Sequence, residues 1–363
     1  MSDYINGRIA RLRAQMKNLN TEALFITNEP NRYYLSGFTG SNALLYITME
    51  EAKLITDFRY LEQASSQCQE YEIMDQGAEG LIATAMKLAK KDHIESIGFE
   101  SDHVSYSTYL ELKEYKEHRF VPTKNVVEKI RQIKDEQELK KMRQAAKIAD
   151  TAFSDVLLFI KENHQKGLTE RDIALKLEVL MKENGASKTS FASIVASGAK
   201  SSLPHAEPDL NTLKPGDFVV MDFGCVFEGY CSDMTRTVVI GQPTDKHREI
   251  YGIVLKAQME ALSKICSGVE GKLVDKIARD IITEAGYGKY FGHGLGHSVG
   301  IEIHENPRFS PKETQIIEAG MVLTVEPGIY IPRFGGVRIE DMIIIKDKGI
   351  ENLTHSPKEI IVI

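Results

Sequence analysis

Apolar residues at the start of the chain recur at helical spacing and predict an amphipathic helix. Ile5, Ile9, Leu12, Met16 and Leu19 fall on one stripe of such a helix. After it, short apolar runs alternate with helical patterns up to about residue 125, which is typical of an α/β domain. We expect strands at 23–27, 43–48, 53–56 and 96–99 and helices at 58–69 and 79–91.

The segment between the first two strands, residues 31–41, reads NRYYLSGFTGS and is expected to be a turn-rich loop. Near residue 125 the pattern changes to a charged, periodic stretch that runs to Asn163, with Asp135 and Glu138 at its expected helix start. A second helix is expected from a cap at Thr169 to Gly185. These changes predict one domain over residues 1–125 and a second over 126–363.

From about residue 190 the chain is rich in glycine and in short apolar runs, but these predicted strands carry carboxylates. A tight turn at residues 226–229 would place Asp222 opposite Asp233 in a hairpin. Glu326 and Glu340 are likewise centred on the turn sequence IPRFGG. Directly opposed residues share a face of the sheet, so each hairpin is expected to present a pair of acids.

Most acidic residues lie on solvated faces, but the flanking sequences VVMDFG and VLTVEPG have the character of buried strands. An unpaired charge costs several kcal/mol in such a position. Two divalent cations would balance the charge of the four carboxylates. Metal pairs about 3.5–4 Å apart are used to hydrolyse amides and phosphates. The carboxylates therefore predict a dinuclear metal site.

Three of the ten histidines fall within FGHGLGHSVGIEIHE: His293, His297 and His304. The first two have the i, i+4 spacing of a zinc-binding helix. The four glycines around them argue against a helix, and no HExxH motif is present. The glycines indicate a tight loop where backbone approaches a ligand. One imidazole with four carboxylates is a hard ligand set that suits Mn²⁺ better than a structural zinc site.

Composition and charge limit the partners and the cellular compartment that we expect for this protein. The chain has 363 residues, 42% of them apolar and 27% charged, as in ordinary globular proteins. A net charge of −7 and the lack of a basic run argue against nucleic acid as a partner. The sequence shows no signal-peptide core and no run of 18 apolar residues, and its four cysteines lack CxxC spacing. We therefore expect a cytoplasmic protein with reduced thiols and no membrane contact.

The series MDFG…SDMTRT, GHGLGHSVGIEIHE, VLTVEPGIY and GVRIED resembles the proline-specific metallopeptidases of the "pita-bread" fold, the aminopeptidase P and prolidase family. The similarity runs from about residue 125 to the end, and YYLSGFTGS and ITDFRY are similar to the family's first domain. The resemblance implies an α+β protein with two domains. An α/β N-terminal domain would precede a pita-bread domain whose curved, mostly antiparallel sheet is covered by helices.

The resemblance also implies roles for particular residues. The ligands of two divalent ions, most often Mn²⁺ with Co²⁺ or Zn²⁺ as substitutes in vitro, would be Asp222, Asp233, His297, Glu326 and Glu340. Among these, the acids at 233 and 340 would bridge both ions. Catalytic roles would fall to His205, His304 and Glu326, and substrate binding to His205, His293, His304 and Arg338. The family also implies a homodimer.

The implied function is hydrolysis of the Xaa-Pro bond at the N-terminus of small peptides, by an Xaa-Pro aminopeptidase. The alternative is an Xaa-Pro dipeptidase (prolidase). Two further alternatives are methionine aminopeptidase and a non-catalytic or creatinase-like protein of the same fold. The additional N-terminal domain, His293 and Arg338 argue against the first of these, and the complete ligand set argues against the second.

Overall fold

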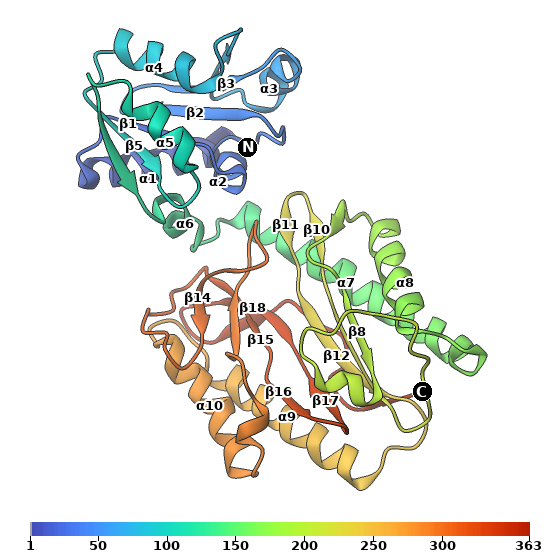
Figure 1. The fold of residues 1–363 in the computed structure, drawn as a ribbon. Coiled ribbons are helices and arrows are strands. Elements are labelled where there is room, and N and C mark those ends of the chain that lie inside the picture. Colours follow the sequence, from blue (N-terminus) through green and yellow to red (C-terminus); the bar gives the residue numbers. More distant parts are fainter. Residues whose placement is uncertain (1) are drawn as a thin grey trace. The chain divides into compact units, whose positions relative to one another are not determined.

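The computed structural model describes the backbone of residues 2–363 and the side chains from residue 4 onward. The chain forms two compact units that divide between Arg131 and Gln132 (Figure 1). Helix α6 (Val126–Arg131), which follows the boundary expected near residue 125, lies in the first unit. The expected two-domain α+β architecture is confirmed.

The first unit is built on a six-stranded sheet in the order β4-β3-β2-β1-β5-β6. The pairs β1–β2 and β2–β3 are antiparallel and the other neighbours are parallel. Its strands are β1 (Ala23–Ile26), β2 (Ala43–Thr48), β3 (Ala52–Thr56), β4 (Glu72–Asp75), β5 (Ser96–Glu100) and β6 (Arg119–Thr123). Its remaining helices are α1 (Ser2–Leu19), α2 (Glu29–Ser36), α3 (Leu61–Gln67), α4 (Leu81–Lys91) and α5 (Tyr106–Lys113).

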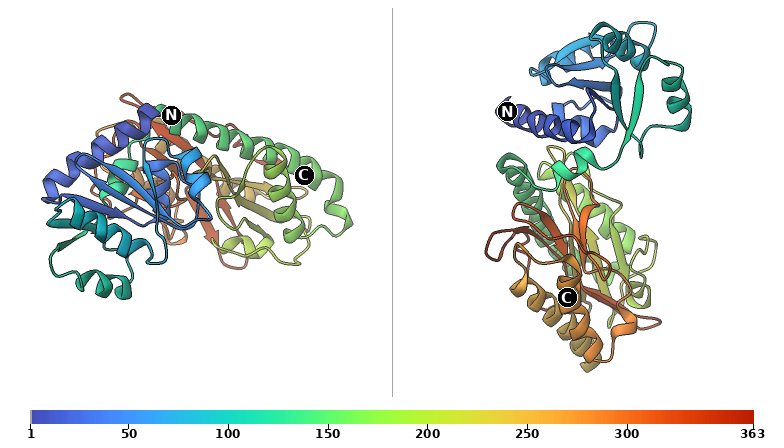
Figure 2. Two further views of the ribbon diagram at one scale, coloured as in Figure 1. Left: turned by 90° about the horizontal axis from the view of Figure 1, so that it is seen from above. Right: turned by 90° about the vertical axis from the view of Figure 1, so that its left-hand side faces the viewer.

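Helices cover both faces of this sheet. Every residue of β1 and β2 is buried, as expected for strands that are covered on two sides. Figure 2 shows α1 on one side of the sheet and α4 and α5 on the other. The stripe of α1 predicted from the sequence supplies buried residues at Ile5, Ile9, Leu12 and Met16.

The expectation of a loop over residues 31–41 is wrong for its first half, because α2 continues to Ser36. Local signals for this helix are present in the sequence. Pro30 lies in its first turn, and Gly37 ends it in the left-handed conformation at φ 76°. Arg32 and Tyr34 of this helix are buried, so that packing against the rest of the unit stabilises eight residues that are marginal as an isolated helix.

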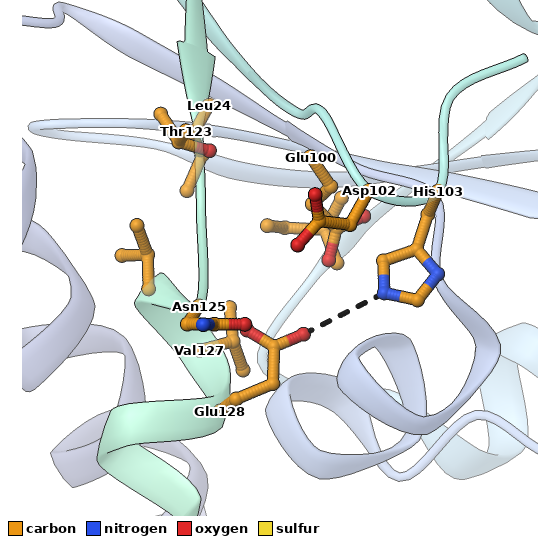
Figure 3. Close-up of a pocket in the computed structure, with 10 residues that line it drawn as sticks. Leu24, Glu100, Asp102, His103, Thr123, Asn125, Val127 and Glu128 are labelled. Atoms are coloured by element: carbon orange, nitrogen blue, oxygen red, sulfur yellow. Dashed lines mark ion pairs between the residues drawn. The ribbon is translucent and has the colours of Figure 1, made fainter.

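A small pocket lies between β5, β6 and α6 of the first unit (Figure 3). The buried carboxylate of Glu100 accepts hydrogen bonds from the backbone amides of Thr27 and Asn28, at 2.7 and 2.8 Å. Glu128 lies 3.8 Å from the His103 ring on the opposite wall. The pocket volume is about 10 Å³, which is room for a single water molecule. The pocket is therefore too small to be a candidate functional site.

The second unit contains mostly antiparallel sheets. The strand orders are β20-β12-β9-β8, β14-β13-β15-β18-β19, β11-β10-β7 and β16-β17, and β12–β20 is parallel. The strands are β7 (Lys188–Thr189), β8 (Ile194–Ser197), β9 (Phe218–Phe223), β10 (Cys225–Phe227), β11 (Tyr230–Cys231), β12 (Met234–Val239), β13 (Gly296–Ser298), β14 (Glu305–Phe309), β15 (Val322–Val325), β16 (Gly328–Ile331), β17 (Gly335–Arg338), β18 (Asp341–Ile345), β19 (Ile350–Asn352) and β20 (Ile361–Val362).

Two helix pairs enclose these strands, as Figure 1 shows. The helices are α7 (Glu136–Asn163), α8 (Glu170–Glu183), α9 (Asp245–Lys264) and α10 (Gly271–Glu284), with short 3₁₀ turns η1 (His164–Lys166), η2 (Gly198–Ser202) and η3 (Gly288–Tyr290). One apolar core lies between α7, α8 and the sheet of β8, β9 and β12. A second core lies between α9, α10 and the strands β15 to β18.

The predicted starts of α7 and α8 are confirmed, because both are closed by capping boxes. Asp135 accepts from the Glu138 amide while Glu138 reaches back to the Asp135 amide. Thr169 and Asp172 make the same reciprocal pair at α8. The four cysteines are free thiols, as expected. None of the helices formed by the described residues combines the length and apolar content needed to cross a bilayer.

Candidate metal centre

Asp222 reaches the centre from β9. Val219, Met221 and Phe223 of this strand pack into the core beneath α7 and α8, so alternation turns Asp222 to the opposite face. The predicted pairing of Asp222 with Asp233 is wrong, since Asp222 pairs with Thr235.

The reason is the position of the preceding turn. It is a two-residue turn at Glu228 and Gly229, with φ of 43° and 80°, centred one residue later than expected. Asp233 consequently lies just before β12, beyond the paired residues. Burial raises its pKa, and the neighbouring charges of Glu340 and Asp222 raise it further. The two aspartates are therefore close in space although they are not paired on the ladder.

The second acid pair has the predicted register. Val325 pairs with Asp341, and Gly328 pairs with Arg338 on the adjoining ladder. Both ladders have the same register, which places Glu326 opposite Glu340. Burial raises the pKa of both carboxyls, that of Glu326 to about 8.

His297 reaches the centre from β13, and glycine makes this possible. A Cβ on Gly296 would lie 2.0 Å from the carbonyl oxygen of Thr324, so only glycine allows β13 to approach β15 this closely. The prediction that no helix forms here is confirmed, but Gly296–Ser298 form a strand and not the expected loop. His297 Nδ1 lies 3.1 Å from the carbonyl oxygen of Ser298, which can only accept a hydrogen bond. Nδ1 therefore holds the proton, and Nε2 presents its lone pair.

This lone pair faces the carboxylates. His297 Nε2 lies 3.5 Å from Asp233 Oδ2 and 3.5 Å from Glu326 Oε1. Ligand atoms of Asp233, His297 and Glu340 all lie within 4.8 Å of one another, and the three residues are buried. In the described part of the chain, the buried Oδ1 of Asp222 has no hydrogen-bond partner. Clustered acids, a lone pair and an unpaired buried oxygen together fit a bound cation.

Arg338 is a buried cation whose guanidinium contacts these acids. Its Nη2 donates to Asp222 Oδ2 at 2.5 Å and its Nη1 to the Tyr330 hydroxyl at 2.7 Å. Its Nε donates to Thr235 Oγ1 at 3.0 Å, and that hydroxyl donates to Glu340 Oε2 at 2.7 Å. Only 3% of its side chain is exposed, and its three nitrogen atoms all donate to groups of the protein.

The three other histidines predicted to act at the site, His205, His293 and His304, lie around this cluster. The half-buried ring of His293 accepts from the Tyr330 hydroxyl through Nε2 at 2.9 Å, since its Nδ1 donates to the Gly294 carbonyl. Burial and then the charge of Arg338 lower the pKa of His293 to about 4. The His304 ring lies edge-on to His297, with centroids 4.4 Å apart. Arg338 Nη1 donates to the carbonyl oxygen of Pro204 at 3.4 Å, which places the adjacent His205 at this cluster.

Sequence reasoning missed Arg308. It pairs directly with His297 on the β13–β14 ladder, so both side chains lie on one face of the sheet. Unlike Arg338 it is exposed, and among the described residues its guanidinium has no ion-pair partner. After burial, its charge is one of the causes that lower the pKa of His297 and His304, and at Glu326 it offsets a small part of the rise caused by burial. In the sequence Arg308 stands out only as an arginine four residues after His304, in HENPRF. Its position opposite His297 is visible only in the pairing of β13 with β14.

Without bound metal, the folded protein should lose stability as the pH rises above neutrality. The raised pKa values of Asp233, Glu326 and Glu340 mean that the folded metal-free chain binds more protons than the unfolded chain. The contribution of these three carboxyls is fully present below their unfolded pKa values, near pH 4, and is lost as pH rises toward 8, by on the order of a few kcal/mol. His293 and His297 have lowered pKa values and act in the opposite direction below about pH 6.5, so thermal unfolding in excess chelator is compared at pH 7 and pH 8.5. A melting temperature that rises with pH in the chelated protein would contradict the clustered, buried acids.

Comparisons with known proteins agree with this geometry. The profile of Metallopeptidase family M24 matches residues 140–347, and that of the Creatinase/Prolidase N-terminal domain matches residues 8–133. The structure is similar to the Xaa-Pro dipeptidase from Bacillus anthracis, with 44% identity, a TM-score of 0.95 and coverage of 99% of this chain and 100% of that one.

Two further relatives are nearly as similar. The X-Pro aminopeptidase from Thermotoga maritima is 37% identical, with a TM-score of 0.89 and coverage of 96% and 100% of the two chains. A Xaa-Pro dipeptidase of Pyrococcus horikoshii is 39% identical over 99% of this chain and 100% of that protein. The expectation of an enzyme is confirmed, and so is the resemblance to the aminopeptidase P and prolidase group. This chain belongs to Metallopeptidase family M24.

Proposed function

We propose that the protein is an Xaa-Pro dipeptidase that requires two divalent metal ions. The sequence alone favoured an Xaa-Pro aminopeptidase and kept the dipeptidase as the alternative. The relatives support the reverse order, because several of them are named Xaa-Pro dipeptidase or prolidase. One solved relative is named an aminopeptidase, so that substrate length is the point to test.

The residues proposed to hold the ions are Asp222, Asp233, His297, Glu326 and Glu340. Four carboxylates and one imidazole form a hard ligand set, which supports Mn²⁺ as the native metal. When bound, the two ions supply an activated water nucleophile at neutral pH and polarise the scissile carbonyl group. Arg338 offsets the remaining negative charge and, through Thr235, orients Glu340.

The surrounding histidines would bind and orient the peptide. His304 and His205 are exposed at the cluster, where a ring N–H can donate to the oxyanion that develops on the scissile carbonyl. His293, held by Tyr330, is proposed to line the proline pocket. Glu326, whose pKa is raised to about 8 without metal, is proposed to carry a proton to the leaving nitrogen.

The observation that carries dipeptidase activity is the exposed guanidinium of Arg308 opposite His297. In an Xaa-Pro dipeptide the terminal carboxylate lies on the proline itself, directly after the scissile bond. In a tripeptide it lies one residue further away. A cation on the strand beside the centre can therefore favour the shorter substrate, and a guanidinium suits a carboxylate because it donates two parallel hydrogen bonds. Arg338 is less suited to this task, since its donors are already engaged.

Rates with Xaa-Pro and Xaa-Pro-Yaa peptides under Mn²⁺ test this function, and we expect the dipeptides to be preferred. Arg308→Ala should lower kcat/KM for dipeptides by about 10- to 150-fold, the value of a charge-assisted hydrogen bond. Tripeptides should be affected much less. Arg248→Ala, at an exposed arginine of α9, is the matched control. Equal losses on both substrates, or faster tripeptide cleavage by the parent chain, would favour the aminopeptidase.

The homodimer and the cytoplasmic location stay predictions from sequence.

A further inference from the structure

We propose that Lys134 is a positioning residue for His304 and acts through a buried ion pair with Glu305. The inference rests on the proposed function for the role of His304. Lys134 Nζ lies 3.0 Å from Glu305 Oε2, and the two side chains are only 1% and 8% exposed. The cost of removing both charges from water offsets much of their attraction, so such a pair contributes little net stability. Glu305 directly follows His304 in the chain, so the ion pair is well placed to fix the position of His304.

The carboxylate of Glu305 fills the inside of the turn that carries His304. Its Oε1 accepts from the Glu302 amide at 3.3 Å, and the Gly300 amide donates to the Glu302 carbonyl at 3.0 Å. A Cβ on Gly300 would lie 2.4 Å from Glu305 Oε1, so any larger residue at position 300 would displace the carboxylate from its place in the turn. The conformation of the turn therefore depends on where the carboxylate of Glu305 is held.

Lys134 is a rigid partner for that carboxylate. Its amide donates to the Gly320 carbonyl at 3.0 Å, and the next residue, Asp135, caps α7 through its capping box. These contacts hold the backbone of Lys134 between the start of α7 and the strand region before β15. The ammonium group is consequently presented to Glu305 from a fixed point within the second unit.

His304 itself has few contacts that could fix its direction. Its side chain is exposed, and its ring packs edge-on against His297 at an interplanar angle of 69°. The direction of its ring therefore follows the backbone of the turn. Removal of the ammonium of Lys134 leaves the Glu305 carboxylate buried without its counter-charge. Movement of that carboxylate toward solvent would open the turn and displace His304.

A double-mutant cycle tests this coupling. Lys134→Met should lower kcat on the preferred peptide by about 10- to 100-fold, as expected for a displacement near 1 Å, while metal content stays unchanged. In the His304→Ala background the same substitution should change kcat by less than about threefold, because its effect passes through His304. Arg143→Met is the control. Arg143 makes an ion pair with the distant residue Glu351, at 2.6 Å, and neither residue belongs to this turn. The control variant should lower the melting temperature and leave kcat unchanged.

Two measurements keep the test decisive if Lys134→Met is unstable or the parent is inactive. Lys134→Gln, which also removes the charge, replaces Lys134→Met if that variant does not fold. Lys134→Met/Glu305→Gln removes both charges and keeps an acceptor for the Glu302 amide, so no unpaired charge is drawn toward solvent and kcat should return to within about threefold of the parental value. The ¹H–¹³C ring signal of His304, recorded in the Zn²⁺-loaded chain, should shift in the single lysine variant, return toward its parental position in the double variant, and not shift in Arg143→Met. An unshifted signal in the single variant, independent losses in the cycle, or a double variant as slow as the single one would overturn the inference. Inactivity of the parent on Xaa-Pro peptides would contradict the proposed function alone.

Discussion

Asp233→Asn is expected to abolish peptidase activity and metal binding together. Asp233 is buried, and its ligand oxygen lies within 4.8 Å of those of His297 and Glu340. An amide has no charge with which to hold a cation between the remaining acids. Because bound metal contributes several kcal/mol of transition-state stabilisation, activity should fall by at least about 10³-fold. Metal analysis of the purified variant and rates on Xaa-Pro peptides measure the two losses.

The same variant provides an internal check against misfolding. In the metal-free parent, the charges of Glu340, Asp222 and Glu326 all raise the pKa of Asp233, so this carboxylate is repelled when it ionises. Asp233→Asn should therefore raise the melting temperature of the chelated protein at pH 8 while activity is lost. Asp280→Asn, at a half-exposed aspartate paired with Lys276 on α10, is the control and should change neither property. Retention of metal and activity in Asp233→Asn would refute the proposed ligand set.

His304→Ala is expected to retain both metal ions and to lower kcat by about 10²- to 10³-fold. This is the usual loss when one donor to a developing oxyanion is removed. His304 is exposed and packs edge-on against His297, so its truncation leaves no buried group without a partner. The effect should therefore fall on kcat more than on KM or on the melting temperature. Steady-state kinetics and metal analysis of one protein preparation separate these quantities.

His355→Ala is the matched control, since His355 is also exposed. It should leave kcat and metal content unchanged. Loss of metal from His304→Ala would show that His304 belongs among the ligands, and an unchanged kcat would remove it from the proposed catalytic groups.

The sequence determined those features that depend on neighbouring residues. The capping boxes at Asp135 and Thr169 are encoded within four residues, and both α7 and α8 begin where these signals predict. The glycines around His297 exclude a helix by their local conformational cost, and the structure has a strand there. The register that brings Glu326 opposite Glu340 follows from one short connection around Arg333. Motif resemblance then supplied the family and the candidate ligands.

Tertiary structure decided whatever depends on a turn type or on residues far apart in the chain. Asp222 pairs with Thr235 because Glu228 and Gly229 form a two-residue turn, and a shift of one residue in the turn centre moves the partner by two positions. The helix α2 forms because packing stabilises eight residues whose pattern also suits a loop. Arg308 faces His297 only through the β13–β14 ladder. Lys134 and Glu305 are 171 positions apart, and no local pattern relates them. Such contacts arise when the two apolar cores bring distant segments together, and a linear pattern does not contain that information.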